Sequence, residues 1–549
     1  MASMQLSAEL AKTVAFLAFS LLSILLIILF LYVFGTVVSF LIFYIKESVH
    51  SSGRPPVAAT VFHQLIFFKT LFDYHTNLAR KNKTFRMIKP SHSDIYTTDP
   101  ANIEHFMKSN FSNYTRGEFN RNVMKDLFGD GIFSVDGEKW RHQRKLASYE
   151  FSTKVLRDFS SVVFRAKAAN LAKKIAQEAR TAASVDIQDL FMKVTLDSIF
   201  KVGFGFDLDT LSGSDEFAAS FSRAFDDSNH IVFLRFSDIF WEAKRYFNIG
   251  KEKQLKRNLK VIDEFVFRLI SRKREKMNTS TEEVSILQKL SGMLTSNLTE
   301  DCVDFFFQKT KEDILSRFVL TSKKDSEMTD RYLRDIILNF LIAGKDTTAN
   351  TLSWFFYMLC KSPLVQEKIV AEIEDLTASQ NRDDSSIDEF MLNLTEEVLD
   401  SMHYLHATLT ETLRLFPAVP VGGKFAEEDD VLPDGFKVKK GDGVNYLTYT
   451  MGRMAFIWGE DAEEFRPERW IMNGAFHPES PFKFVAFNVG PRICLGKDFA
   501  YRQMKILAAT LLHFFKFKLK DESYIATYKT MFTLHMDNGL PVIPIPRFS

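Results

Sequence analysis

The chain has 549 residues, of which 55 are phenylalanine and three are cysteine. Its 70 basic and 69 acidic side chains leave a formal charge of +1, which gives no bulk electrostatic attraction to nucleic acid. With 46% hydrophobic and 25% charged residues the composition is that of a globular protein. Cys302, Cys360 and Cys494 are odd in number and widely spaced, so neither a disulfide framework nor a zinc knuckle is indicated, and a reducing compartment fits best.

An uncharged apolar run from Thr13 to Ile45 stands near the start of the chain. At ~1.5 Å per helical residue it would extend about 50 Å, more than the ~30 Å hydrocarbon core of a bilayer. A cleaved signal peptide usually has a shorter apolar region, so an uncleaved anchor is favoured. Basic residues are more frequent after the run, and the positive-inside rule places the main body in the cytosol. We expect a tail over 1–12, a transmembrane anchor over 13–45 and a proline-containing linker over 46–60.

Residues 61–549 are expected to form one catalytic domain, because no comparable linker and no repeat interrupts them. Long helical patterns dominate, with short β-type runs such as "DIYTTDP" and "FKVKKGDGVNYLTYT". The prediction is a mainly α protein with a smaller β-rich part. Residues 286–310 carry no clear period and are expected to be a loop or an insertion.

The first motif of the body is "GEKWRHQRKLAS", Gly137 to Ser148. Helical spacing places Trp140 and Arg144 one turn apart on one face. An indole N–H and a guanidinium are both hydrogen-bond donors without an acceptor, which suits negatively charged ligand groups. The same helix carries Lys139, Arg141 and Lys145, which form either a docking patch for an acidic partner or an ordinary solvated face.

A helical pattern runs from about Arg331 to Lys361 and has "AGKDTTAN" at its centre. Ala343 and Gly344 are small, whereas Asp346 and Thr347 add an acid and an alcohol where a core helix normally has neither. Small residues leave room for O2 beside a helix, a hydroxyl can hold water or oxygen, and a carboxylate can relay protons. A kink in which threonine hydroxyls bond to backbone carbonyls is the simpler interpretation, and both can hold.

Two further segments contain potential ion-pair partners. In "ETLRLFP", Glu411 and Arg414 share one face of a helix that must end before Pro417, so they can pair. Such a pair is usually a solvated surface feature. Downstream, "FRPERW" supplies Arg469.

The stretch "FNVGPRICLG" puts Cys494 in a tight turn just before a helical pattern. Backbone N–H donors and the positive end of that helix favour a thiolate. Gly490 allows a turn with positive φ, Gly496 removes a Cβ that would block a flat ligand, and Arg492 offers a cation for a carboxylate. A planar ligand that bears carboxylates and takes one sulfur ligand is haem. A structural cysteine would explain the sulfur but not the surrounding Phe, Gly and Arg.

The pattern Phe487-x-x-Gly490-x-Arg492-x-Cys494-x-Gly496 resembles the haem-binding signature of the cytochromes P-450. The resemblance extends from about Gly53 to the end of the chain, with the other motifs in the expected order. It implies the cytochrome P-450 fold, mainly α with a smaller β-rich lobe, with haem b between them and Cys494 as the axial ligand of the iron.

The resemblance also implies roles for the other motifs. Thr347 delivers protons with Asp346 behind it, and Trp140 and Arg144 bind the haem propionates with the help of Arg492. Glu411, Arg414 and Arg469 form a structural ion-paired lock and are not catalysts. By family placement, the candidate substrate contacts are Phe119, Phe340, Ala343, Ala418, Val419 and Phe532, although each taken singly is more readily explained as plain core.

Within the family, "DGEKWRHQRKLAS" and "MGRMAFIWGEDAEEFRPERW" are similar to the plant clan that hydroxylates long-chain fatty acids at or near the ω carbon. This implies an O2-dependent monooxygenase in the endoplasmic reticulum membrane, with electrons from NADPH through NADPH-cytochrome P-450 reductase. One alternative is another lipophilic substrate, such as a sterol, alkane or terpenoid. Rearrangement of hydroperoxides is a second, although those relatives usually lack the acid–alcohol pair and lengthen the cysteine loop. A non-enzymatic membrane haem-binding protein is a third.

Overall fold

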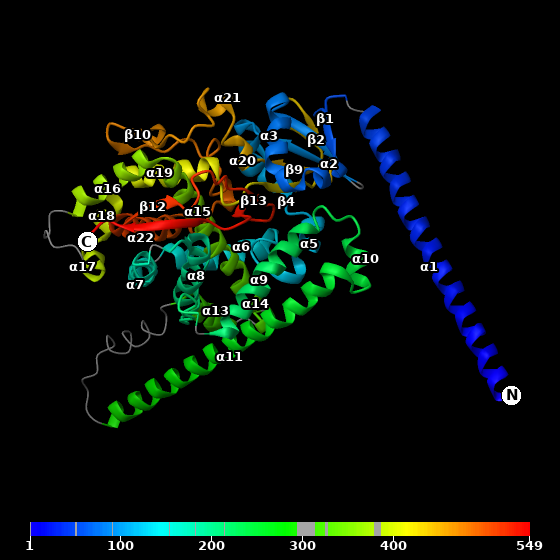
Figure 1. Cartoon of the computed structure of the whole chain (residues 1–549), viewed down its shortest axis with the longest axis horizontal. Helices are drawn as coiled ribbons and strands as arrows, with labels where there is room; N and C mark the ends of the chain where they lie inside the picture. The colour runs from blue at the N-terminus through cyan, green and yellow to red at the C-terminus, as the bar shows by residue number, and fades with distance from the viewer. Residues whose placement is uncertain are drawn as a thin grey trace.

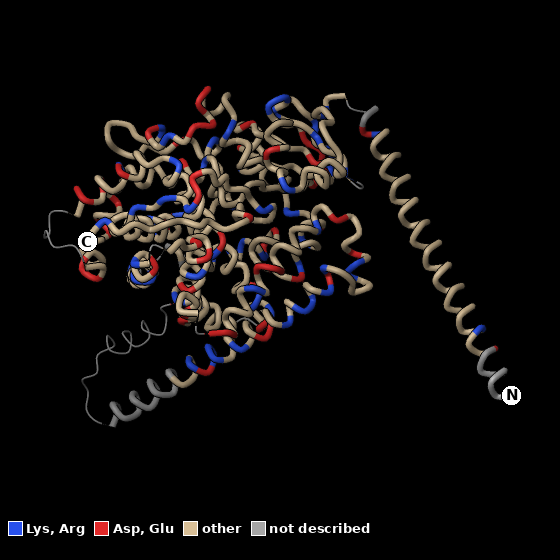
Figure 2. The backbone as a smooth tube through the Cα atoms, in the orientation of Figure 1, with Lys and Arg blue, Asp and Glu red and all other residues tan. Residues whose placement is uncertain are grey.

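The computed structural model describes residues 2–49, 52–89, 92–152, 154–181, 183–213, 215–293, 313–323, 328–377 and 386–548. The first helix, α1 (Ala2–Val49), projects from the body of the protein (Figure 1). Its segment Glu9–Glu47 is long and apolar enough to cross a membrane, and the most apolar stretch of that segment is not buried inside the protein. Figure 2 shows α1 almost free of charge between its ends. The predicted anchor over 13–45 lies within this helix.

The end of α1 is joined to the body by a buried carboxylate. Glu47 is 4% exposed, and its side chain forms ion pairs with Arg54 at 3.5 Å, with Lys439 at 2.9 Å and with Arg86. Arg86 lies on β2 (Thr84–Ile88) of the largest sheet. Nearby, the ring of Phe40 in α1 meets the ring of Phe62 edge-on at a centroid distance of 5.3 Å. The last turns of α1 therefore pack on the β-rich part of the body.

That part is built on a six-stranded sheet with the strand order β1-β2-β3-β9-β6-β4. The β1–β2 and β3–β9 pairs are parallel, and the remaining pairs are antiparallel. A second sheet has the order β12-β15-β5, and three two-stranded ribbons complete the β structure. The strands are β1 (Val57–Thr60), β2 (Thr84–Ile88), β3 (Ser93–Thr97), β4 (Tyr114–Thr115), β5 (Val185–Asp186), β6 (Gly422–Ala426), β7 (Asp430–Val431), β8 (Lys437–Val438), β9 (Gly443–Tyr446), β10 (Ile471–Met472), β11 (Ala475–Phe476), β12 (Phe515–Leu519), β13 (Tyr528–Lys529), β14 (His535–Met536) and β15 (Pro541–Pro546).

Helices form most of the remaining body, as the sequence predicts. They are α2 (Val61–Ile66), α3 (Leu71–Lys81), α4 (Pro100–Glu104), α5 (Glu118–Phe128), α6 (Gly137–Ser152), α7 (Lys154–Ala179), α8 (Ile187–Ile199), α9 (Glu216–Leu234), α10 (Trp241–Tyr246), α11 (Gly250–Met293), α13 (Ile314–Ser322), α14 (Asp330–Gly344), α15 (Asp346–Lys361), α16 (Pro363–Thr377), α17 (Ile387–Asn393), α18 (Glu396–Ser401), α19 (His403–Leu415), α20 (Thr448–Met451), α21 (Ala455–Trp458) and α22 (Lys497–Phe514).

One prediction about these helices is wrong in part. Residues 286–310 lack a clear period and were expected to be a loop or an insertion; α11 continues to Met293, so the loop is wrong for residues 286–293, and the insertion stays a prediction. A run of residues with good helix propensity can extend a helix without an amphipathic period, because propagation adds one hydrogen bond for each residue fixed. Residues 294–310 lie outside the described part of the chain.

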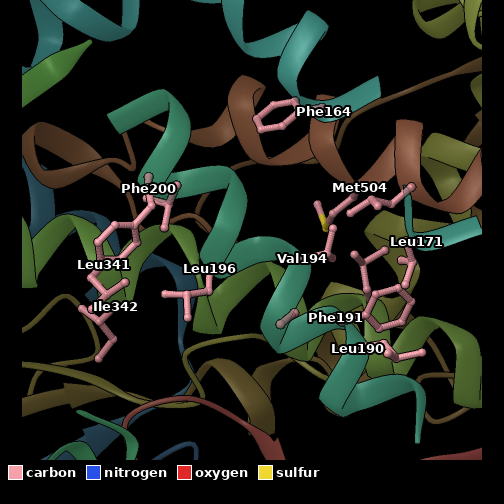
Figure 3. Packing of buried hydrophobic residues seen from close by; sticks show 14 of the residues in the cluster. Phe164, Leu171, Leu190, Phe191, Val194, Leu196, Phe200, Leu341, Ile342 and Met504 are labelled. Atoms are coloured by element: carbon pink, nitrogen blue, oxygen red, sulfur yellow. The ribbon is translucent and has the colours of Figure 1, made fainter. Parts of the chain in front are cut away.

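The main hydrophobic core lies where α7, α8, α14 and α22 meet. Figure 3 shows Leu171 of α7 and Met504 of α22 near Phe191 and Val194 of α8, and Phe164 of α7 belongs to the same cluster. Asp186 caps α8 by accepting hydrogen bonds from the N–H groups of residues 188 and 189 at 3.1 and 3.4 Å. This packing fixes the helices that support the site described next.

Candidate active site

The site is a cavity of about 500 Å3 inside the body of the protein. Ligand cavities commonly have volumes of ~300–1,000 Å3. Its wall combines residues of α3, α6, α14 and α15 with the segment after α19 and the loop before α22. The motifs predicted separately from the sequence therefore meet around one space.

The cysteine loop presents Cys494 to this cavity. The N–H of Cys494 donates to the carbonyl of Phe487 at 2.8 Å, and the N–H of Ile493 donates to the carbonyl of Gly490 at 3.0 Å. Gly490 has a φ of +64°, and an added Cβ would lie 2.0 Å from the carbonyl oxygen of Met107. The predicted turn is present. Its positive φ and its close approach to Met107 require a glycine at position 490 whether or not a ligand is bound.

The packing of the protein does not explain the glycine at position 496. It precedes the first residue of α22, and an added Cβ would meet no protein atom closer than Cε1 of Phe151 at 3.8 Å and Sγ of Cys494 at 3.9 Å. The protein does not need a glycine there, whereas a flat ligand lying against Cys494 would need one. Cys494 is exposed toward the cavity, but the surrounding protein removes bulk water from its thiol and so raises its pKa, while the N–H of Gly496 and the cation of Arg144 act in the opposite direction. A bound metal ion would supply the charge that favours the thiolate.

Among the described residues the cavity wall offers one cysteine thiol, that of Cys494, and no cluster of metal ligands. Among the described residues no group of three His, Cys, Asp or Glu side chains is placed to hold a metal ion. A metal at Cys494 would therefore take its remaining ligands from an organic group, as iron does in haem.

Basic side chains and an indole gather beside Cys494. Arg492 lies 4.4 Å from the ring centroid of Trp140, and its guanidinium donates to Asp136 at 2.6 Å. Arg144 donates to the carbonyl of Ile493 at 2.8 Å. In the described structure the indole N–H of Trp140 has no hydrogen-bond partner, and Nε of Arg492 is buried without one.

Arg116 is a member of this group that the sequence analysis missed. It lines the cavity, and its Nε is buried and has no partner among the described residues. Burial and the neighbouring Arg116 lower the pKa of Arg492 to about 9. Among the described residues, Asp136 is the only carboxylate that forms an ion pair with any of these three arginines. Arg116, Arg144 and Arg492 therefore suit a ligand that brings negative charge, and the two propionates of haem fit this requirement.

The helix predicted over 331–361 is divided. Helix α14 ends at Gly344 and α15 begins at Asp346, with Lys345 at the break. The hydroxyl of Thr347 donates to the carbonyl of Ala343, so the kink with a threonine bonded to the backbone is present. Ala343, Gly344 and Thr347 all line the cavity.

Gly344 also serves helix packing. An added Cβ would lie 2.7 Å from Cδ1 of Ile199, so the small residue lets α14 approach α8 closely. The small residues predicted at Ala343 and Gly344 therefore have two roles: Gly344 allows the close packing of α14 on α8, and both residues line the cavity.

Asp346 is buried behind Thr347 and lies outside the cavity lining. Its carboxylate accepts a hydrogen bond from Asn229 at 3.0 Å and lies 3.2 Å from Nζ of Lys345. The same Lys345 pairs with Asp226, whose side chain is 46% exposed. Burial lowers the pKa of Lys345, but these two carboxylates raise it above its usual value. A chain of charged contacts thus connects the helix break to solvent, and the sequence analysis did not predict its partners.

The ion pair of Glu411 and Arg414 is fully buried. The Glu411 carboxylate accepts from Arg414 Nε at 2.7 Å and Nη2 at 2.8 Å, and from the indole of Trp470 at 2.8 Å. Arg469 Nε lies 3.6 Å away. The geometry is that of a buried structural lock and not of a solvated surface pair.

The predicted substrate contacts divide into two groups. Phe340, Ala343, Ala418, Val419 and Phe532 line the cavity. Phe119 does not. Its ring packs against Phe236 and Phe425 at centroid distances of 6.0 and 6.4 Å, because α5 turns this side chain toward its aromatic neighbours while Asn120 reaches the cavity.

Comparison with known proteins identifies the family. The family model described as "Cytochrome P450" matches residues 54–540. The chain is 50% identical over 517 residues to "Cytochrome P450 704C1" of Pinus taeda, covering 92% of this chain and 95% of that protein. It is 42% identical over 505 residues to "Cytochrome P450 704B1" of Arabidopsis thaliana, covering 89% and 93%, and 38% identical over 478 residues to "Cytochrome P450 86B1" of the same plant, covering 86% and 81%. The chain therefore belongs to the cytochrome P-450 family of haem monooxygenases.

Proposed function

We propose that the protein hydroxylates a long-chain fatty acyl substrate at or near its ω carbon, with O2 as oxidant and electrons from NADPH through a membrane-bound reductase. The observation that carries this proposal is the cavity, which connects Cys494 with apolar side chains of α14, the segment after α19 and the C-terminal region. An inert methyl group reacts only when it is held at the reacting centre, and an apolar wall can hold a chain end by burial and shape.

We assign the holding of haem to Cys494 and to the donors beside it. Cys494 would ligate the iron, and Trp140, Arg144, Arg492 and Arg116 would bind the propionates. When bound, haem with a thiolate ligand supplies O2 activation and C–H oxidation. Gly496 leaves the face beside the sulfur open.

We assign proton handling to Thr347. Its own proton is given to the carbonyl of Ala343, so its oxygen can accept a hydrogen bond from a group in the cavity. Asp346 lies behind it, held by Asn229 and Lys345. The contacts through Lys345 to the partly exposed Asp226 give protons a route from solvent that avoids the apolar cavity.

We assign substrate positioning to Phe340, Ala343, Ala418, Val419 and Phe532. These five side chains lie on the cavity wall and carry no hydrogen-bonding group. They would hold an alkyl end and exclude water from the reacting carbon, so their sizes should decide which carbon is oxidised.

The anchor and the partners complete the proposal. Helix α1 would cross the endoplasmic reticulum membrane once, with the linker and residues 61–549 forming the cytosolic catalytic domain. Lys139 and Arg141 of α6 pair with Asp130 and Glu138, and Lys145 is exposed beside them. The exposed face of α6 that carries these basic side chains would bind the reductase, because the paired carboxylates neutralise only part of its positive charge.

The test is turnover by the purified full-length protein in lipid vesicles with NADPH-cytochrome P-450 reductase. A reduced-CO spectrum first establishes the thiolate–haem. Terminal hydroxy products from fatty acids of increasing chain length, formed only with NADPH, would support the proposal. A normal spectrum with no such product from free fatty acids or from their neutral derivatives would refute the acyl substrate, and sterols, alkanes and terpenoids would then be assayed.

A further inference from the structure

A histidine on the wall of the cavity has both ring nitrogens buried and unpartnered. His75 lies on α3, is 2% exposed and lines the same space as Cys494. In the described part of the chain neither Nδ1 nor Nε2 has a hydrogen-bond partner. Leaving a buried polar group unpaired is costly, so such groups in native proteins usually meet water or a ligand.

The neighbours of His75 form a polar recess, which we define as Gln64, His75, Lys89, Asp94 and Tyr96. All five line the cavity, and each is more than nine-tenths buried. Gln64 Nε2 donates to the hydroxyl of Tyr96 at 3.0 Å, and that hydroxyl donates to Asp94 at 3.3 Å. The ring of His75 lies 5.0 Å from the ring of Tyr96.

The charges of the polar recess are already paired. Nζ of Lys89 lies 2.7 Å from Oδ2 of Asp94, and Nε2 of His92 lies 3.2 Å from Oδ1. Burial and the neighbouring Lys89 hold the pKa of His75 at about 3, so its imidazole is neutral at physiological pH. An added carboxylate would meet Asp94 without a free cation to compensate it. The arginines that line the cavity, Arg116, Arg144 and Arg492, lie beside Cys494 instead, with Asp136 paired to Arg492.

A neutral imidazole has one donor and one acceptor. A hydroxyl group offers the same combination and can bond to either nitrogen. An ionised carboxylate can only accept from the ring N–H, cannot donate to the bare ring nitrogen, and would add like charge near Asp94.

The polar recess also lies behind a surface suited to lipid. Gln64 points inward from α2, whereas Phe62, Leu65 and Ile66 of the same short helix are exposed, and Phe62 contacts Phe40 of α1. The head group of an amphipathic lipid that arrives from the bilayer would therefore come from the side where the polar recess lies.

We propose that the polar recess binds the head group of the substrate and selects a neutral, hydroxyl-bearing head, as in a fatty alcohol or a monoacylglycerol, over a free carboxylate. This inference rests on the proposed oxidation of an acyl chain and names the class of its other end. The chain would lie along the apolar wall, with its ω end toward Cys494.

The experiment compares three substrates of equal chain length, the fatty acid, the fatty alcohol and the monoacylglycerol, with the reconstituted full-length holoenzyme. Both kcat/KM and the dissociation constant from equilibrium titration are measured. The variants are His75→Leu, which removes both ring nitrogens, His75→Gln, which keeps a donor and an acceptor, and His230→Leu, a control at a half-buried histidine outside the cavity lining.

We expect the wild type to prefer the two hydroxyl-bearing substrates. His75→Leu should lower their kcat/KM and weaken their binding about tenfold, with little change for the acid, because the substrate hydroxyl loses its partner. His75→Gln should restore part of the loss, and His230→Leu should match the wild type.

Three results would overturn the inference. They are equal or tighter binding of the free acid by the wild type, an equal loss for all three substrates in His75→Leu, and no change in that variant, which would mean that the polar recess holds water only. If the wild type binds the substrates with the expected ranking but oxidises none of them, the proposed reaction fails and the head-group inference stands.

Discussion

Replacing the two glycines of the cysteine loop by alanine should affect different properties: Gly490→Ala should lower the stability of the protein, and Gly496→Ala should lower its haem content. In Gly490→Ala the new Cβ would start 2.0 Å from the carbonyl oxygen of Met107. Ordinary contact needs ~3.4 Å, so the loop must move by about 1.4 Å. The positive φ adds ~1–2 kcal/mol and the overpacking ~1–3 kcal/mol, for a total loss of about 2–5 kcal/mol in the free energy of unfolding.

Gly496→Ala has no comparable clash within the protein. The nearest atom to the new Cβ is 3.8 Å away, and the φ of −90° is accessible to alanine. The loss of stability should stay at or below ~1 kcal/mol, the range for an unfavourable N-cap. The methyl group would, however, occupy the face beside Cys494 where a flat cofactor must lie, so the folded protein should hold little haem.

The assay separates the two effects. Urea unfolding of the purified full-length variants is followed by circular dichroism, and haem per chain is determined from absorbance together with the reduced-CO band. We expect a lowered urea midpoint for Gly490→Ala and a near-normal midpoint with depleted haem for Gly496→Ala. A wild-type haem content in Gly496→Ala would refute the placement of the cofactor against this residue, and an unchanged midpoint in Gly490→Ala would refute the steric argument.

Three further predictions concern other parts of the site. Thr347→Ala should lower the amount of product formed per NADPH consumed by about 10²-fold or more, the range for a positioned proton-transfer group. Thr347→Ser keeps the hydroxyl and should retain most of this ratio, which is measured by product and NADPH assays. Glu411→Gln leaves the buried cation of Arg414 without its charge partner. The free energy of unfolding should fall by ~3–5 kcal/mol, which is measured as a lower urea midpoint. A loss below ~1 kcal/mol would contradict a structural role for this buried ion pair. The depressed pKa of His75, about 3, means that the unfolded chain binds more protons than the folded one between that pH and its usual value of 6.5. Stability from this group is therefore complete above pH 6.5 and falls on acidification, and the urea midpoint of His75→Leu should drop less between pH 7 and pH 4 than that of the wild type.

The cysteine loop and the Trp140 helix could be predicted from the sequence because each motif is local. The turn at Gly490 depends on a few adjacent residues, and the spacing of Trp140 and Arg144 follows from the helical period. The buried pairing of Glu411 with Arg414 agrees with its spacing, although only the structure shows that Trp470 and Arg469 approach the same carboxylate.

The contacts that escaped prediction join elements far apart in the chain. Arg116 reaches the donors beside Cys494 from the segment before α5, and Asp226 of α9 meets Lys345 at the helix break. A local sequence pattern cannot predict these long-range contacts, because they depend on how the helices pack against one another. The orientation of Phe119 was missed for the same reason, since its aromatic neighbours come from the segment after α9 and from β6.

The buried Glu47 couples the first helix to the catalytic body mechanically. Because its carboxylate is shared by Arg54, Arg86 and Lys439, a change in the tilt of α1 should be transmitted to the largest sheet and not absorbed by the proline-containing segment that follows. A helix longer than the local hydrocarbon thickness tilts to fit it. If α1 spans a bilayer as proposed, membrane thickness would set the angle at which the cavity faces the lipid, and vesicles of different acyl length would tune substrate entry without altering any residue of the site.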